Sequence, residues 1–290
     1  MIVPLSDHPY YLWQALVQAV ELKRLGIPAT YLVYTQTPAP SARLRAIMGA
    51  GLADWHVWRD WRTSKTYNAA MKPWLVGKWL TANPDRVDAP FVLIDPDCIP
   101  TRAPAGEVTA TRWFGTDTDS YTCPGYLRSK PGVWDALCAL VGVDPTTADR
   151  PGVGAQVAAV GQPGEFWETV AAKSIEAHAM MTAGPTDVQA WCAEMYVTAL
   201  ECARRGIDLA PDPGMSMLWA NGPAAGWETH GYFHDAGVTA ENGRDFCKIT
   251  HQASPWGKSL DVHPESASAR YVELIRAARE AHPELTWEAP

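Results

Sequence analysis

Two aspartates, Asp95 and Asp97, follow directly after the apolar segment 91–94, with one residue between them. That segment has the composition of a buried strand, and in open α/β sheets ligands bind beyond the carboxyl ends of the strands. Two hard carboxylate oxygens at such a place suit Mg²⁺ or Mn²⁺ that carries a diphosphate. The spacing therefore predicts a divalent-metal site, and the competing interpretation is an Asp-Pro-Asp turn whose carboxylates cap backbone amides.

Glu194 is a further carboxylate that could take part in a reaction. It lies inside an apolar segment of helical spacing. Such a group is either paired structurally, here with Arg204 or Arg205, or buried in order to do chemistry such as accepting a proton. Asp187 stands at the start of the same segment. It is either the residue that caps the helix or a ligand for a substrate hydroxyl.

The elements that must position these residues begin with a strand–helix–strand unit. Residues 1–5 and 29–34 are apolar and β-rich, whereas residues 9–25 have apolar side chains at helical spacing up to Gly26. Further helices are expected over 41–48 and 70–82, before the strand at 91–94. This alternation predicts an α/β fold with a mostly parallel central sheet and helices on both faces.

The second half of the chain is less regular. Strands are expected over 109–114 and 156–160, and helices over 134–141, 165–181, 186–205 and 266–282. Residues 151–156 are expected to form a tight glycine-containing loop, and residues 212–259 are rich in Gly, Pro, Trp and His without periodicity. Long irregular segments in a compact domain are usually functional loops. Without a repeat or linker, residues 1–290 are expected to form a single domain.

Composition excludes several classes of protein. The six cysteines form no CxxC pair, which argues against a disulfide framework or zinc ribbon and favours the cytoplasm. No apolar run reaches the roughly 18–20 residues of a membrane span, and the first residues do not have the pattern of a secretory signal. The net charge of −8 argues against a protein whose whole surface binds nucleic acid.

Several segments resemble the plant peptidyl-serine galactosyltransferase and hydroxyproline O-arabinosyltransferase group, which are glycosyltransferases of the GT-A fold. They occur in the same order over roughly residues 10–250 and read YNAAMKPW (67–74), WL (79–80), VLIDPDCI (92–99), WCAEMY (191–196), THGY (229–232) and FCK (246–248). The resemblance implies a GT-A-type fold, a UDP-linked nucleotide-sugar donor, Mn²⁺ or Mg²⁺, and retention of anomeric configuration. Residues 1–100 would bind the nucleotide sugar, 101–260 the sugar and acceptor, and 261–290 would be a C-terminal helix.

The resemblance also implies roles for individual residues. The metal ligands would be Asp95, Asp97 and His230, with His234 and His251 as rivals for the third position. The catalytic residues would be Glu194 and Asp187, and the donor would contact Tyr67, Lys72, Asp95, Gln156 and Lys248. For each lysine the alternative is a solvated surface position.

A local cationic stretch at residues 54–78 raises the question of the acceptor. It contains Arg59, Arg62 and Lys65 among tryptophans at positions 55, 58 and 61. Cations for phosphates and rings for bases are typical of a nucleic-acid surface, although a tryptophan-rich element with a solvated edge has the same composition. The favoured acceptor is a hydroxymethylated pyrimidine in bacteriophage DNA, flipped into the site. A peptide or small-molecule hydroxyl is the alternative, and a nucleotidyltransferase or a non-catalytic nucleotide-binding module is the alternative of another class.

Overall fold

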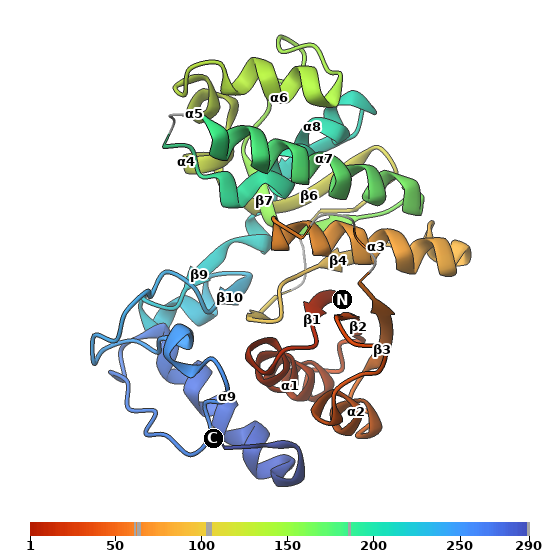
Figure 1. Cartoon of the computed structure of the whole chain (residues 1–290). Helices are drawn as coiled ribbons and strands as arrows, with labels where there is room; N and C mark the ends of the chain where they lie inside the picture. Colours follow the sequence, from red (N-terminus) through yellow and green to blue (C-terminus); the bar gives the residue numbers. More distant parts are fainter. Residues whose placement is uncertain (61, 63–64, 103–105, 185–186, 289–290) are drawn as a thin grey trace.

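The computed structural model describes residues 1–60, 62, 65–102, 106–184 and 187–288. Within these residues a seven-stranded central sheet has the strand order β3-β2-β1-β4-β7-β6-β8. Its strands are β1 (Ile2–Ser6), β2 (Thr30–Thr35), β3 (Asp54–Arg59), β4 (Phe91–Leu93), β6 (Arg112–Asp117), β7 (Val153–Ala159) and β8 (Asp208–Pro211). Figure 1 shows this sheet between two groups of helices.

The N-terminal unit follows the predicted strand–helix–strand order. β1, β2 and β3 are parallel neighbours, and α1 (Pro9–Arg24) and α2 (Ala42–Gly49) connect them. Proline at the first position of α1 is favourable because an amide hydrogen at this position would have no acceptor inside the helix, so nothing is lost by its absence. Gly26 follows α1 with a φ of 69°, a left-handed conformation that glycine adopts without strain. The Ser41 hydroxyl caps α2 by accepting from the Leu44 amide at 3.1 Å.

In the other half of the sheet one strand, β7, runs in the opposite direction to the rest. β4 is parallel to β1, but β7 is antiparallel to both β4 and β6, and β6 is parallel to β8. The sheet is therefore mostly parallel, which confirms the predicted fold class. The loop expected at residues 151–156 is wrong, because most of that segment belongs to β7.

The two faces of the sheet bury different residues, because successive side chains of a strand point to opposite sides. In β1, Ile2 packs on the face covered by α3 (Met71–Ala82), α6 (Val133–Val141), α7 (Gly164–Ala183) and α8 (Ala193–Arg204). Its neighbours Val3 and Leu5 pack on the face covered by α1, α2 and α9 (Ala267–Ala281). None of the helices in the described residues has both the length and the apolar character that crossing a membrane requires.

Helices α3 and α7 pack with their backbones in direct contact. A Cβ atom at Gly164 would lie 2.5 Å from the carbonyl oxygen of Gly77, so only glycine fits at this crossing. The close packing fixes the orientation of α3, which carries Lys72, relative to α7, which carries His178.

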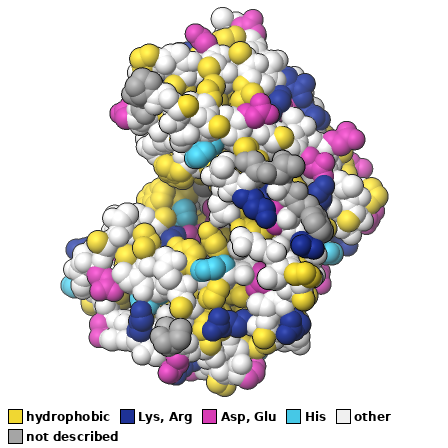
Figure 2. Space-filling view, in the orientation of Figure 1, with side chains coloured by type: hydrophobic (Ala, Val, Ile, Leu, Met, Phe, Trp, Pro, Cys, Tyr) yellow, Lys and Arg dark blue, Asp and Glu magenta, His cyan; other side chains and the backbone are white. Residues whose placement is uncertain are grey.

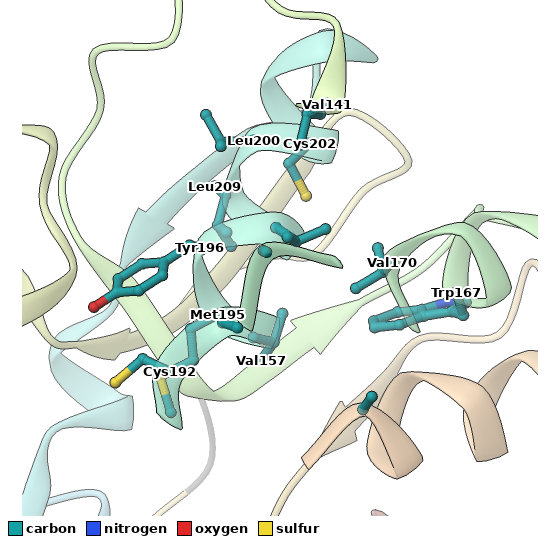
Figure 3. Packing of buried hydrophobic residues seen from close by; sticks show 14 of the residues in the cluster. Val141, Val157, Trp167, Val170, Cys192, Met195, Tyr196, Leu200, Cys202 and Leu209 are labelled. Carbon is teal, nitrogen blue, oxygen red and sulfur yellow. The ribbon is translucent and has the colours of Figure 1, made fainter. Parts of the chain in front are cut away.

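Helix α8 packs on β7 and is the support for Glu194. Figure 3 shows Met195 and Tyr196 of α8 and Val157 of β7 in this apolar cluster. A Cβ at Gly154 would lie 2.7 Å from the Met195 sulfur, so a larger residue would push α8 away. The helix begins at Ala193 rather than at the predicted residue 186, and a short 3₁₀ turn, η3 (Ala190–Cys192), precedes it. Residue 186 lies outside the described residues.

A second, three-stranded sheet forms from parts of the chain that are far apart in sequence. Its order is β5 (Cys98–Pro100), β10 (Tyr232–His234) and β9 (Met217–Trp219). β5 starts directly after Asp97 and pairs antiparallel with β10, so that His234 lies opposite Cys98. The irregular segment 212–259 thus contains two strands, and one of them brings a histidine to the aspartate pair.

Candidate active site

A cleft of about 490 Å³ opens at the carboxyl end of β4. It lies between the first turn of α1, the start of α3 and the turn that joins β4 to β5, and Figure 2 shows the hollow on this face of the molecule. Its lining includes Tyr10, Tyr67, Asp95, Asp97, Trp191 and Lys248. Both predicted aspartates therefore share one cleft, at the end of the strand where ligands bind in α/β sheets.

Gln18 of α1 holds the turn that carries Asp95 and Asp97 through two hydrogen bonds to its backbone. The fully buried Gln18 amide donates to the carbonyl oxygens of Asp95 at 2.8 Å and Cys98 at 2.6 Å. The Tyr31 hydroxyl in turn donates to the Gln18 carbonyl at 2.9 Å. Sequence analysis did not single out Gln18, although a glutamine on the apolar face of a helix is a signal for a buried polar contact.

Asp97 belongs to one of two charged groups in the cleft. Its carboxylate forms an ion pair with the Lys248 ammonium, and His234 Nε2 lies 3.4 Å from it. Burial alone would raise the pKa of Asp97, but Lys248 and His234 outweigh burial and hold that pKa below its ordinary value. Burial would lower the pKa of Lys248, but Asp97 and Asp235 hold it above its ordinary value. Both partners are therefore ionised at neutral pH.

The donor atoms of Asp97, Cys98 and His234 all lie within 4.8 Å of one another. Carboxylate oxygen, cysteine sulfur and imidazole nitrogen are ligands of divalent transition metals, so this group fits a metal ion. Burial raises the pKa of the Cys98 thiol, so a metal that binds its sulfur would displace the thiol proton. Of the three predicted metal ligands only Asp97 belongs to it. The His230 ring instead lies 3.0 Å from the Gly226 carbonyl oxygen, and His251 is buried and stacks on Phe246 at 4.8 Å.

Asp95 belongs to a second charged group in the same cleft. The Lys72 ammonium lies 3.1 Å from Asp95 and 3.1 Å from Glu194. The Tyr67 hydroxyl donates to the Glu194 carboxylate and accepts from the Glu194 amide at 3.2 Å. Burial would lower the pKa of Lys72, but Asp95 and Glu194 outweigh it and raise that pKa above its ordinary value. Lys72 is therefore a buried, permanently charged cation in the cleft.

Glu194 itself is not among the residues that line the cleft. Its side chain is 8% exposed and lines a separate cavity of about 30 Å³ together with Lys72 and Trp167. The alternative of a pair with Arg204 or Arg205 is wrong, because both arginines reach Glu201, at 2.8 and 3.9 Å. Glu194 therefore acts on the cleft through Lys72 and Tyr67.

Two further predicted residues lie elsewhere. Gln156 is fully buried, where it accepts from the Thr116 hydroxyl at 2.9 Å and donates to the Cys98 sulfur at 3.1 Å. It therefore supports the Cys98 side chain rather than lining the cleft. The Asp187 side chain is 85% exposed and pairs with Lys130 at 2.6 Å, away from the residues that line the cleft.

The predicted cationic surface is not formed by Arg62, which corrects the sequence interpretation. The Arg62 side chain is only 5% exposed, binds Asp60 through two nitrogens at 2.9 Å each, and lies over the Tyr34 ring. Lys65 lies 3.8 Å from the same aspartate. Because Arg62 is buried and paired, it contributes to packing and presents no charge to a phosphate. Arg59 ends the strand β3, and residue 61 lies outside the described residues.

Comparison with protein-family models finds no match, and comparison with curated proteins finds none either. Among solved structures the chain is similar to the galactosyltransferase LgtC in complex with donor and acceptor sugar analogues, with 10% identity, 95% of each chain covered and a TM-score of 0.51. A structure of an LgtC active-site mutant has 10% identity, 95% coverage of each chain and a TM-score of 0.49. The apo structure of the bifunctional glycosyltransferase WbbM has 9% identity and a TM-score of 0.45. The match covers 82% of this chain but only 45% of WbbM.

The likeness to LgtC identifies the fold. This chain has the α/β architecture of GT-A-type glycosyltransferases, as the sequence resemblance implied. The likeness to the plant group remains a resemblance of short sequence segments.

Proposed function

We propose that this protein is a metal-dependent glycosyltransferase that moves a sugar from a UDP-linked nucleotide-sugar donor to a hydroxyl group. The observation that carries the proposal is a pair of lysines in the cleft whose side chains are only 13% and 15% exposed: Lys72 pairs with Asp95, and Lys248 pairs with Asp97. Two cations held at the end of the central strand suit the diphosphate of such a donor. The fold is also the one in which LgtC has been solved with donor and acceptor sugar analogues.

The chemistry follows from the charge that the reaction creates. When the bond between sugar and diphosphate breaks, negative charge builds up on the leaving oxygen, and preorganised cations lower the energy of that state. Lys72 and Lys248 supply such charge from positions where little water screens it. Asp97, Cys98 and His234 would hold a divalent ion, which supplies Lewis acidity when bound. Of the two ions that the resemblance implies, Mn²⁺ suits the nitrogen and sulfur donors better than Mg²⁺, which prefers oxygen.

Stereochemistry and the role of Glu194 are separate parts of the proposal. The resemblance implies retention of the anomeric configuration, and NMR of the anomeric proton of the product tests it. Because Glu194 lines the small separate cavity and not the cleft, we assign it to holding Lys72 and Tyr67 rather than to attack on the sugar. An inverted product would overturn the proposed retention.

The acceptor of the proposed reaction is a hydroxyl group. The hypothesis of a DNA acceptor loses its main support, because Arg62 is buried against Asp60 and Tyr34. A hydroxyl on a peptide or small molecule needs no cationic surface, so we favour it over the hydroxymethylated pyrimidine.

The test is to incubate the protein with a panel of sugar nucleotides in the presence of Mn²⁺, Mg²⁺ or EDTA. Hydrolysis of the donor is measured as the release of nucleoside diphosphate. We expect slow hydrolysis of one donor that EDTA abolishes. Asp97→Asn should remove it, whereas Asp149→Asn, which alters an exposed aspartate paired with Arg128, should not. Release of pyrophosphate from a nucleoside triphosphate would instead indicate a nucleotidyltransferase. Absence of any donor hydrolysis together with nucleotide binding would indicate a binding module.

A further inference from the structure

A large apolar side chain, Trp191, is exposed inside the cleft. The residue is 54% exposed although it lines the same cleft as Asp95 and Lys72. A tryptophan that leaves half of its surface in water gives up a large part of the burial free energy that such a ring supplies. An aromatic ring in that position is typical of a surface that a ligand covers.

The position of Trp191 is fixed by its neighbours. The Tyr67 hydroxyl oxygen lies 2.7 Å from the Trp191 carbonyl oxygen, a second acceptor within reach of the single proton that it donates to Glu194, and the Tyr121 ring lies 5.9 Å from the Trp191 ring. The next residue, Cys192, is fully buried at the start of α8. Trp191 is therefore presented on a rigid support, and the same Tyr67 hydroxyl connects it to Glu194, which holds Lys72.

This connection places Trp191 beside the centre of the proposed reaction. If Lys72 contacts the diphosphate, the sugar to be transferred lies next to it, and the acceptor must approach within contact distance of that sugar. The cleft wall formed by Trp191 and Tyr67 borders Lys72. An acceptor that lies on this wall would reach the sugar.

The charge of the cleft argues for a neutral acceptor. Among the described residues that line it, Lys72 and Lys248 are the only cations, and both are paired with carboxylates. If both lysines turn to the diphosphate, no described cation of the lining remains for a phosphate on the acceptor. The net charge of −8 also repels a polyanion.

The remaining lining combines aromatic rings with uncharged polar groups. Tyr10, Tyr11 and the stacked pair Tyr67–His178 supply the rings, and Asn68 supplies an amide. An aromatic face suits the C–H face of a sugar ring, and amides and hydroxyls suit its hydroxyl groups. We propose that Trp191 is the platform on which a neutral saccharide acceptor stacks. This inference rests on the proposed function and names its acceptor class.

Ligand-observed saturation-transfer NMR tests the inference without requiring turnover. The probes are methyl β-D-glucopyranoside and methyl β-D-galactopyranoside, each with and without UDP and Mn²⁺. We expect saturation of the ring protons of at least one glycoside by the wild-type protein. Trp191→Ala should weaken that binding at least about tenfold, as loss of an aromatic anchor does. Trp191→Phe should keep part of it.

Trp58→Ala is the matched control, because Trp58 is a half-buried tryptophan on β3 that does not line the cleft. Its glycoside binding should equal that of the wild type. Equal binding by Trp191→Ala, absence of binding of both glycosides by the wild type, or preferred binding of a thymidine oligonucleotide would overturn the inference. Donor hydrolysis measured on the same samples separates the two proposals. Hydrolysis without glycoside binding refutes only this inference. Glycoside binding without any donor hydrolysis refutes the proposed function and leaves Trp191 as a platform that binds a saccharide but not an acceptor.

Discussion

Removing the Lys72 ammonium should destabilise the fold, because two carboxylates would lose their shared cation. In Lys72→Met, Asp95 and Glu194 would remain in positions that are 19% and 8% exposed. Breaking a buried ion pair by removing one partner costs about 3–5 kcal/mol. The Tyr67 hydroxyl still donates to Glu194, so we expect about 3 kcal/mol, the lower end of that range.

A double-mutant cycle with Glu194→Gln isolates the interaction between the two residues. The single change Glu194→Gln keeps the Tyr67 hydrogen bond and leaves Lys72 with Asp95, so it should cost about 1–2 kcal/mol. In the double variant the uncompensated Glu194 charge is gone, and the total cost should fall below the sum by about 1–3 kcal/mol. Urea denaturation followed by tryptophan fluorescence measures all three values.

Lys78→Met is the control, because Lys78 forms an ion pair of 2.8 Å with Glu168 at the surface, where it is 39% exposed. Such a pair contributes less than about 1 kcal/mol. If Lys72→Met costs no more than Lys78→Met, or if the cycle is additive, the buried network is refuted. Donor hydrolysis by the same variants should fall more in Lys72→Met than in Glu194→Gln. The opposite ranking would mean that Glu194 acts directly on the sugar.

Three further predictions concern the metal group and a buried acid. His234→Ala should weaken Mn²⁺ binding, measured by calorimetry, at least about tenfold more than His230→Ala, because only His234 lies with Asp97. Co²⁺ bound to the protein should show a thiolate-to-metal charge-transfer absorption that Cys98→Ser removes, and an unchanged spectrum would exclude sulfur from the site. Burial raises the pKa of Asp235 from 3.8 to about 8. Between these two pH values Asp235 is protonated in the folded protein and ionised in the unfolded chain. The free energy of unfolding therefore falls as the pH rises, by up to about 1.4 kcal/mol per pH unit. Denaturation at pH 5, 6 and 7 with EDTA should show a smaller decline in Asp235→Asn, and equal slopes would contradict the raised pKa.

The parts of the molecule that the sequence predicted well depend on near neighbours. The strand at 91–94 and the helix over 9–25 appear within about one residue of where periodicity and the Gly26 stop signal placed them. The aspartates lie in the cleft because a strand end is a local property of the chain. Such features can be recognised in a short window because the hydrogen bonds and burial that produce them involve residues close in sequence.

Which residues meet in the site was decided only by tertiary structure. The pairing of β5 with β10 brings His234 and Cys98 to Asp97, and nothing periodic in the segment 212–259 encodes that register. The packing of α3 against α7, and of α7 against α8, gives Lys72 both Asp95 and Glu194 as partners. A charged residue such as Lys72 has the same local sequence signal whether it is solvated or buried. Its role depends on partners far along the chain, and only the packing of the folded chain determines those partners.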